Sequence, residues 1–230
     1  MAYPRGLSGL SSRPAGTTVR TVRTVRTVGT VGSTSQADDR FVNRAARWVH
    51  DGRRLDMQDL ADELGVSRAT LFRRAGGREE LLSKALWALT ERTLSEATQR
   101  WEAERPEGAL HTPGTGRHVN AIVSQSKGLR RLLDDEPTLA LRVLTDPRGR
   151  VQTGIVVFVE TLLRQDMVEF GLVPLIEPGA LAYALVRLGE SFLYADVLAA
   201  RQPDVATADR LQQALVEGIQ PWMTSGPRTL

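Results

Sequence analysis

The residues best suited to chemistry in this chain are the arginines around residue 70. Four arginines and no acidic residue occur from Arg68 to Arg78, in the segment VSRATLFRRAGGREEL. An arginine fork donates paired hydrogen bonds to guanine edges and phosphate oxygens, and small or apolar side chains can contact the thymine methyl group. The pattern therefore indicates contact with double-stranded DNA. The candidate contact residues are Gln58, Ser67, Arg68, Ala69, Thr70, Phe72, Arg73 and Arg78.

Two short helices joined by a tight turn are needed to present these side chains. Asp56 has the side chain of a helix cap, and two leucines follow it at positions that face inward. Gly65 can adopt the left-handed conformation that ends this first helix, and Ser67 can cap the second. Leu71 then faces inward while the candidate contact residues of the same helix spread over the opposite arc. Residues 56–81 are therefore predicted to form a helix-turn-helix.

Helices are also predicted on both sides of this unit. Asp38 or Asp39 can cap a helix that ends near Gly52, with Trp48 on its apolar side and therefore in the core. After Gly76 and Gly77, a stretch without proline or glycine continues to about Glu104. As a helix it would be about 40 Å long, at about 1.5 Å per residue. We expect this long helix to connect the DNA-contacting unit to the rest of the chain.

The segment VSRATLFRRAGGREELLSKAL, with the helix at 40–52 before it, resembles the DNA-binding domain of TetR/AcrR-type transcriptional regulators. Their usual pattern is close to V-S-x-x-T-L-Y-x-Y/H-F-x-x-K-E-E-L, and the family's tyrosine, second aromatic residue and lysine are Phe72, Ala75 and Arg78 here. The resemblance covers residues 40–86 and implies a transcriptional regulator, in most cases a repressor. The C-terminal half has a slight similarity to regulators of quorum-signal degradation, which implies a lactone or acyl ligand. The matching positions are Val66, Ser67, Thr70, Leu71, Glu79, Glu80 and Leu81.

The composition excludes several other classes of protein. The absence of cysteine rules out disulfides, thiolate nucleophiles and cysteine zinc sites, and it suits a reducing cytoplasm. No charge-free apolar run reaches the length of about 18 residues that a membrane span needs, and the N-terminus has no signal-peptide core. Residues 1–36 carry five arginines and no acid, whereas residues 79–230 carry sixteen basic and twenty acidic residues. This asymmetry is expected if one end of the protein meets a polyanion.

Residues 1–36 are predicted to form a disordered basic tail. They are rich in Gly, Ser, Thr and Arg, and they contain the repeat TVR-TVR-TVR-TVG-TVG, whose period of three fits neither helix nor strand. Two interpretations remain open for this tail. Either its arginines are a DNA-contacting arm, or the tail is dispensable, for example because the start codon is assigned too far upstream.

The chain beyond the long helix is predicted to be helical and divided by prolines. The linker from Glu104 to Gly116, ERPEGALHTPGTG, has the composition of a loop. His111 and His118 within and after it have no cysteine or carboxylate pair beside them, so we predict no metal site. Further helices are predicted at 117–134, as one helix or two divided near Gly128, and at 138–145, 148–170 and 205–219.

Residues 178–200 indicate how the chain assembles. Only Arg187, Glu190 and Asp196 are charged in this stretch, so a helix of about 22 residues would be apolar on nearly every side. One monomer can cover one side only, and the same helix of a second copy, with the helix at 205–219, would cover the other. A twofold homodimer would present two recognition helices to half-sites of a palindrome about 34 Å apart.

No catalytic constellation accompanies these features, and we predict neither an enzyme nor a cofactor. An all-helical domain with an apolar interior is better suited to binding a small-molecule effector. Two interpretations remain open for its polar and aromatic side chains: they orient a ligand, or they pair among themselves, as Arg187 with Glu190 and Tyr194 with Glu190. The candidate ligand-binding residues are Phe158, Glu160, Tyr183, Arg187, Glu190 and Tyr194.

The sequence thus predicts an all-α protein with an N-terminal three-helix DNA-binding domain and a C-terminal helical domain for ligand binding and dimerisation. The predicted boundaries are a tail at 1–36, the helix-turn-helix domain at 37–83, the C-terminal domain at 84–222 and a tail at 223–230. The predicted function is a dimeric repressor that a small apolar or amphipathic ligand releases from DNA. The alternatives are a ligand-independent DNA-binding or scaffold protein, and an enzyme with a vestigial helix-turn-helix.

Overall fold

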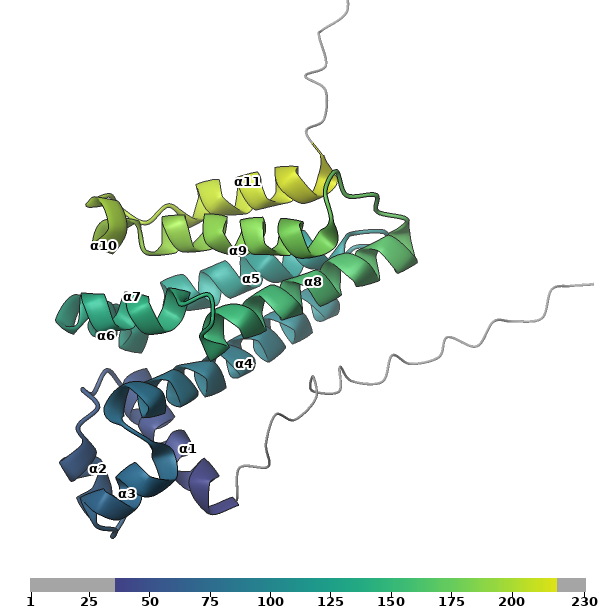
Figure 1. The fold of residues 1–230 in the computed structure, drawn as a ribbon. Coiled ribbons are helices and arrows are strands. Elements are labelled where there is room, and N and C mark those ends of the chain that lie inside the picture. Colours follow the sequence, from purple (N-terminus) through teal and green to yellow (C-terminus); the bar gives the residue numbers. More distant parts are fainter. Residues whose placement is uncertain (1–35, 219–230) are drawn as a thin grey trace, which may run out of the picture. The chain divides into compact units, whose positions relative to one another are not determined.

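Eleven α-helices and no strand make up the part of the chain that the computed structural model describes, residues 36–218 (Figure 1). The predicted all-α class is therefore confirmed. The predicted tails at 1–36 and 223–230 lie outside the described residues, apart from Gln36. The helices are α1 (Gln36–His50), α2 (Met57–Glu63), α3 (Arg68–Ala75), α4 (Arg78–Glu104), α5 (His111–Ser124), α6 (Lys127–Asp135), α7 (Pro137–Thr145), α8 (Arg150–Phe170), α9 (Pro178–Leu193), α10 (Ala195–Ala199) and α11 (Val205–Glu217).

The first three helices form the predicted helix-turn-helix with its preceding helix. The Asp56 carboxylate accepts hydrogen bonds from the backbone amides of Gln58 and Asp59 at the start of α2. Gly65 has a φ of 65°, so it takes the left-handed conformation that the turn requires. The Ser67 hydroxyl then accepts from the Thr70 amide and caps α3. Both predicted caps and the turn are confirmed, whereas α1 begins at Gln36, before the aspartates that were predicted to cap it.

The long helix α4 runs through the predicted connection and packs on both groups of helices. It contacts α1 at one end and α5, α7 and α8 farther along (Figure 1). Its leucines Leu81, Leu82 and Leu86 are buried in an apolar cluster that begins in α1 and continues to α8 and Tyr194. The interior is therefore continuous from the helix-turn-helix into the C-terminal helices, and the predicted domain boundary at residue 83 stays a prediction.

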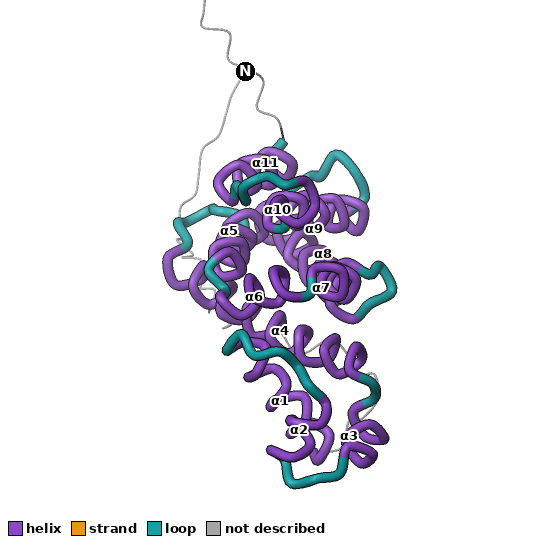
Figure 2. Tube along the Cα trace, turned by 90° about the vertical axis from the view of Figure 1, so that its left-hand side faces the viewer, coloured by secondary structure: helices purple, strands orange, loops and turns teal. Residues whose placement is uncertain are grey.

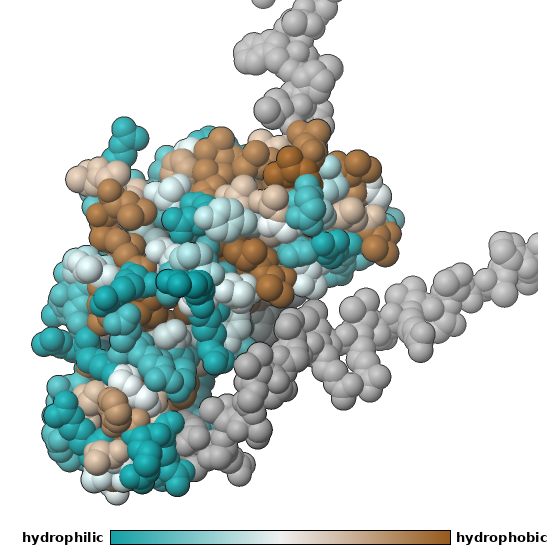
Figure 3. Space-filling model, viewed as in Figure 1, coloured by the Kyte–Doolittle hydropathy of each residue, from teal (hydrophilic) through white to brown (hydrophobic). Residues whose placement is uncertain are grey.

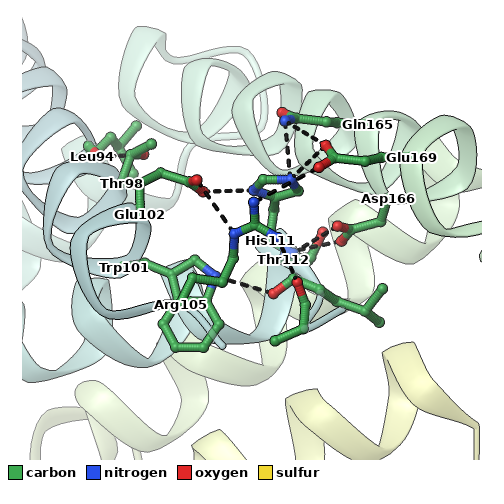
Figure 4. Close-up of polar contacts among 12 residues, drawn as sticks. Leu94, Thr98, Trp101, Glu102, Arg105, His111, Thr112, Gln165, Asp166 and Glu169 are labelled. Carbon is green, nitrogen blue, oxygen red and sulfur yellow. Dashed lines mark hydrogen bonds and ion pairs between the residues drawn. The ribbon is translucent and has the colours of Figure 1, made fainter. Parts of the chain in front are cut away.

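The predicted loop from Glu104 to Gly116 is wrong in its second half, because α5 begins at His111. The cause is a cap that comes from far along the chain. The fully buried Asp166 carboxylate of α8 accepts hydrogen bonds from the backbone amides of His111, at 2.6 Å, and Thr112, at 2.9 Å (Figure 4). Pro113 then lies in the first turn, where its missing N–H removes no hydrogen bond of the helix. Gly114 faces the indole of Trp101, and a Cβ there would lie 2.0 Å from Trp101 Cε2.

A buried histidine joins the ends of three helices beside this cap. His111 Nδ1 lies 2.6 Å from Glu102 Oε1 of α4, and Nε2 lies 2.9 Å from Glu169 Oε2 of α8 (Figure 4). The hydrogen bond with His111 holds the pKa of Glu169 below its ordinary value. The two ring nitrogens face different carboxylates, so the arrangement joins helices rather than surrounding a single ion.

The remaining helices agree with the predictions except at one break. Residues 117–134 are divided between α5 and α6, and the apolar run in 148–170 is helical. The single helix predicted for 178–200 is instead interrupted at Tyr194, which ends α9 and precedes the short α10. Helices α9 and α11 pack against each other and against α5, and they lie at the far side of the bundle from the helix-turn-helix (Figures 1 and 2).

Candidate functional site

The exposed face of α3 brings four of the predicted contact residues together. Arg68, Ala69, Phe72 and Arg73 are all exposed, whereas Leu71 is completely buried. The predicted division of α3 into a buried side and an exposed side is therefore confirmed. Phe72 leaves 62% of its surface exposed in a helix of eight residues, although an aromatic side chain is normally covered. An apolar ring flanked by arginines on a solvent-facing helix suits the contact of a DNA groove.

Three predicted polar residues lie around this face, and each already has an intramolecular partner. The Ser67 hydroxyl lies 2.9 Å from Thr70 Oγ1, which keeps both hydroxyls at the start of α3. The Gln58 amide donates to Asp62 on the exposed side of α2. Hydrogen bonds from the Asp59 and Gln58 backbone amides, together with the nearby charge of Arg68, lower the pKa of Asp56 and keep this cap ionised.

Arg44 of α1 and Arg53 of the turn that follows it are less available for DNA than the arginines of α3, because both contact Glu63. Arg44 forms an ion pair with Glu63. Glu63 also accepts hydrogen bonds from the Trp48 indole, at 3.1 Å, and from Arg53, at 3.3 Å. The Arg53 guanidinium lies 3.7 Å from the centre of the Trp48 ring. One carboxylate thus offsets two of the positive charges in this part of the surface.

Arg78, which was predicted to contact a phosphate, makes three hydrogen bonds within the protein. Its Nε donates to the Leu55 carbonyl at 2.6 Å, and its two terminal nitrogens donate to the Glu136 carboxylate at 2.8 and 2.5 Å. This bidentate pair lowers the pKa of Glu136, against the opposing effect of burial. The Arg78 guanidinium is therefore hydrogen-bonded within the protein. The sequence motif gave no sign of this, because Glu136 lies 58 residues later in the chain.

Comparisons with known proteins decide the family. A family model described as the tetracyclin repressor-like C-terminal domain matches residues 107–217. The solved structure of QsdR, a transcriptional repressor of the TetR family from R. erythropolis, is 30% identical, covers 78% of this chain and 93% of its own, and has a TM-score of 0.68. This chain belongs to the TetR family of transcriptional regulators. The resemblance found in residues 40–86 is thereby confirmed.

Other members of the TetR family are similar at lower identity. A putative TetR-family regulator from Rhodococcus sp. is 17% identical, with 80% of this chain and 98% of that chain covered and a TM-score of 0.47. PfmR from Thermus thermophilus is 19% identical, with 79% and 100% covered and a TM-score of 0.41. No curated protein sequence matches the chain. Among residues 36–218 of this TetR-family regulator, no helix is both long and apolar enough to span a bilayer.

The predicted ligand-binding residues of this TetR-family regulator do not converge on one cavity. Tyr183 and Arg187 are exposed on α9, and Glu160 is paired with Arg164 on the surface of α8. Phe158 is half-buried. None of these lines the open groove of about 480 Å³ between α1 and α4, which is formed by Asn43, Ala88, Glu91, Arg92, Ser95, Glu96 and Gln99.

Glu190 and Tyr194 are the two predicted residues that are buried. Arg187 donates a hydrogen bond to Glu190 at 2.7 Å, so the predicted pairing of these two residues is observed. Burial nevertheless raises the pKa of Glu190 to about 7. Burial and the neighbouring Glu190 charge together raise the pKa of Tyr194. Tyr194 lines a narrow crevice of about 10 Å³ with residues of α5, α6 and α9.

One buried polar residue was missed by the sequence analysis. Gln152 of α8 is 2% exposed, and neither its Nε2 nor its Oε1 has a hydrogen-bond partner among the described residues. It lies where α8 passes from one apolar cluster, which includes Val151, to a second one, against which Val156 packs. The available signal was a glutamine on the apolar side of the helix, four residues before Val156. A buried amide without partners calls for an explanation.

Proposed function

We propose that this TetR-family regulator is a homodimeric repressor that binds a palindromic operator and is released from it by a small apolar or amphipathic ligand. The observation that carries the proposal is the exposed face of α3, where Arg68 and Arg73 flank Phe72 above the buried Leu71. Arg68 and Arg73 are assigned to base edges and phosphates, and Ala69 and Phe72 to the apolar groups of the groove. Gln58, Ser67 and Thr70 are assigned to the backbone at its margin.

The ends of α3 are fixed in a way that supports this assignment. The Ser67 cap holds its first turn, and Lys84 of α4 donates to the Ala75 carbonyl at 3.0 Å at its end. Lys84 also pairs with Glu80 on its own helix. A recognition helix held at both ends loses little conformational freedom on binding, which favours affinity.

Dimerisation is supported by the outer surface of α9 and α11. Tyr183 of α9 is 50% exposed, and Leu211 and Leu215 of α11 are 42% and 44% exposed. Apolar residues gather over these helices in the space-filling view (Figure 3). The proposed partner is the same pair of helices from a second copy, which gives a four-helix interface with twofold symmetry. Such a dimer would carry two α3 helices to successive major grooves on one side of the DNA.

Ligand binding is supported by the buried polar groups rather than by an open cavity. The Gln152 amide can offer a ligand two N–H donors and one oxygen acceptor. Glu190 and Tyr194 are two further buried polar residues of the C-terminal helices. The crevice beside Tyr194, at about 10 Å³, has room for about one water molecule. A ligand would therefore have to stabilise a more open packing of these helices, and that differential affinity would drive release from DNA.

The narrow crevice also favours a second candidate function. In this alternative the C-terminal helices only dimerise, and the protein is a ligand-independent DNA-binding or scaffold protein. Both candidates require α3 to bind DNA, and they differ only in whether a metabolite releases it. Titrating the protein–operator complex with fractionated cell metabolites separates them, because the ligand-independent protein should stay on its DNA with every fraction.

The DNA proposal is tested by selecting bound fragments from the source genome and measuring their retardation by the purified protein. Replacing Arg68 and Arg73 together with alanine should abolish sequence-specific retardation and leave the dimer intact. The matched control is the double variant of Arg148 and Arg201, which removes the same charge from two exposed positions outside the helix-turn-helix. Specific binding that persists in the Arg68 and Arg73 variant would show that α3 is not the recognition helix.

A further inference from the structure

The helix-turn-helix contacts the residue between α6 and α7, Glu136. Two arginines of the DNA-binding side, Arg78 and Arg54, contact the Glu136 carboxylate there, and Arg78 also donates to the Leu55 carbonyl. We call these four groups the Glu136 junction. Arg54 lies 3.4 Å from Glu136. The Glu136 side chain is only 16% exposed, so its charge is weakly screened.

The backbone of Glu136 fixes the position of this carboxylate. Its amide donates to the Leu132 carbonyl and ends α6, and its carbonyl accepts from the Ala140 amide and begins α7. The following Pro137 restricts its backbone further. The side chain makes no capping bond. It is therefore available for Arg78, while its location is determined by two helices at once.

On the other side, the junction reaches the start of the helix-turn-helix. Leu55 directly precedes Asp56, the cap of α2, and Arg78 is the first residue of α4. A shift of the corner between α6 and α7 would therefore act on the entry to α2 and on the base of α4 together. A displacement of Arg78 would also affect α3, because Lys84 of α4 is hydrogen-bonded to the Ala75 carbonyl at the end of α3.

A second close approach keeps the same corner against the DNA-binding side. Gly128 of α6 lies so near the end of α1 that a Cβ there would be 2.2 Å from the Val49 carbonyl oxygen and 2.4 Å from that of His50. Arg131 lies over the Gly52 turn, with its Cβ within 3.5 Å of the position of a Cβ on Gly52. Helix α6 thus has little freedom to slide without moving α1.

We infer that Glu136 is a positioning residue for DNA binding: through Arg78 and the Leu55 carbonyl it sets the orientation of α2 and α3, and it couples that orientation to helices α6 and α7. This inference rests on the proposed function in its DNA-binding part. It replaces the direct phosphate contact predicted for Arg78, since that guanidinium acts on DNA through the helix-turn-helix and not by touching it.

The two roles predict opposite results for Glu136→Gln. The substitution keeps the size of the side chain and both backbone bonds, but it removes the charge that holds Arg78. If Arg78 positions the helix-turn-helix, affinity for a genome-selected operator fragment falls about tenfold, within the usual range of coupling between sites. Affinity for a scrambled fragment of equal length stays within about twofold, because nonspecific binding depends on phosphate charge and not on orientation. If Arg78 is instead a phosphate contact, its release strengthens binding to both fragments.

The control is Arg142→Gln, which breaks an exposed ion pair of 3.2 Å between α7 and Glu79 of α4. Exposed pairs contribute little, so this variant should bind both fragments as the parent protein does. The double variant Glu136→Gln with Arg78→Gln should bind no more weakly than Arg78→Gln alone, because the two residues act as a unit.

A measurement without DNA keeps the inference separate from the proposed function. Hydrogen exchange of the α2 and α3 amides should be faster in Glu136→Gln than in the parent dimer, while exchange in α9 and α11 is unchanged. Equal exchange in α2 and α3, or equal operator affinity of the parent and the variant, overturns the positioning role. If the parent protein selects no specific fragment, the proposed function fails and the exchange comparison still decides on the junction.

Discussion

Glu190 makes the stability of this regulator depend on pH in a direction opposite to that of most carboxylates. Its side chain is buried near the end of α9, with one hydrogen bond from Arg187. Burial raises its pKa from an ordinary 4.5 to about 7, and the Arg187 charge offsets only part of that effect. The folded protein therefore holds a proton on Glu190 more tightly than the unfolded chain does.

The sign and size of the effect follow from this difference. A carboxyl whose pKa is raised on folding contributes stability that is fully present below pH 4.5 and is lost as the pH rises to about 7. One pKa unit corresponds to about 1.4 kcal/mol, so the loss over this interval is about 3 kcal/mol. Glutamine has nearly the same shape and no proton to lose. Glu190→Gln should therefore match the parent protein at about pH 4.5 and below, and exceed its free energy of unfolding by up to about 3 kcal/mol near pH 8.

The assay is urea unfolding of the parent and the variant at equal protein concentration, at several values between about pH 4.5 and 8.5. The quantity to follow is the difference between the two free energies of unfolding, because other carboxylates change both proteins alike. Glu96→Gln is the control: Glu96 also has an arginine one turn away, but it is half exposed, so its substitution should give a flat difference. A difference for Glu190→Gln that does not change with pH would refute the reasoning.

Two further predictions concern packing and burial. Gly114→Ala should lower the free energy of unfolding by about 1–3 kcal/mol, because its Cβ would overlap the Trp101 ring. The control Gly116→Ala, whose Cβ would have no atom within 4 Å, should be neutral or slightly stabilising. Urea unfolding measures both variants, and equal effects would contradict the close packing of Gly114. Gln152→Leu should raise the free energy of unfolding of the ligand-free protein by about 1 kcal/mol or more and abolish release from the operator by metabolites, because it removes an unpaired buried amide. The control Gln165→Leu should lower stability, since that amide contacts His111 and Glu169, and a destabilised Gln152→Leu protein would show that its amide is satisfied.

The parts of the fold that depend on neighbouring residues were predictable from the sequence. The caps at Asp56 and Ser67 and the turn at Gly65 are bonds between residues two to four apart, so the residue types alone indicate them. The burial of Leu71 opposite an exposed Phe72 follows in the same way from helical periodicity. These local features were sufficient to recognise the DNA-binding unit and the family.

The parts that failed depend on residues far apart in the chain. The start of α5 is determined by Asp166, 55 residues after His111, and Pro113 therefore begins a helix where composition indicates a loop. The partner of Arg78 within the protein, Glu136, is likewise 58 residues away and gives no local signal. The break between α9 and α10 at Tyr194 has no proline or glycine beside it that would indicate the end of a helix. The candidate ligand residues were chosen by chemical type on apolar helices, and type alone did not say which of them face outward.

The unbroken apolar cluster through α1, α4 and α8 has a consequence for how this protein can be divided and recombined. Leu133, Val143 and Val151 share that cluster with Phe41 and Leu60 of the DNA-binding helices. A fragment that stopped at residue 83 would expose part of its apolar core to water. A chimaera that joined α1, α2 and α3 to a foreign sensor domain would lack the side chains that complete their core. DNA recognition in this regulator is therefore inherited together with α6, α7 and the first turns of α8, which must be transplanted as one piece.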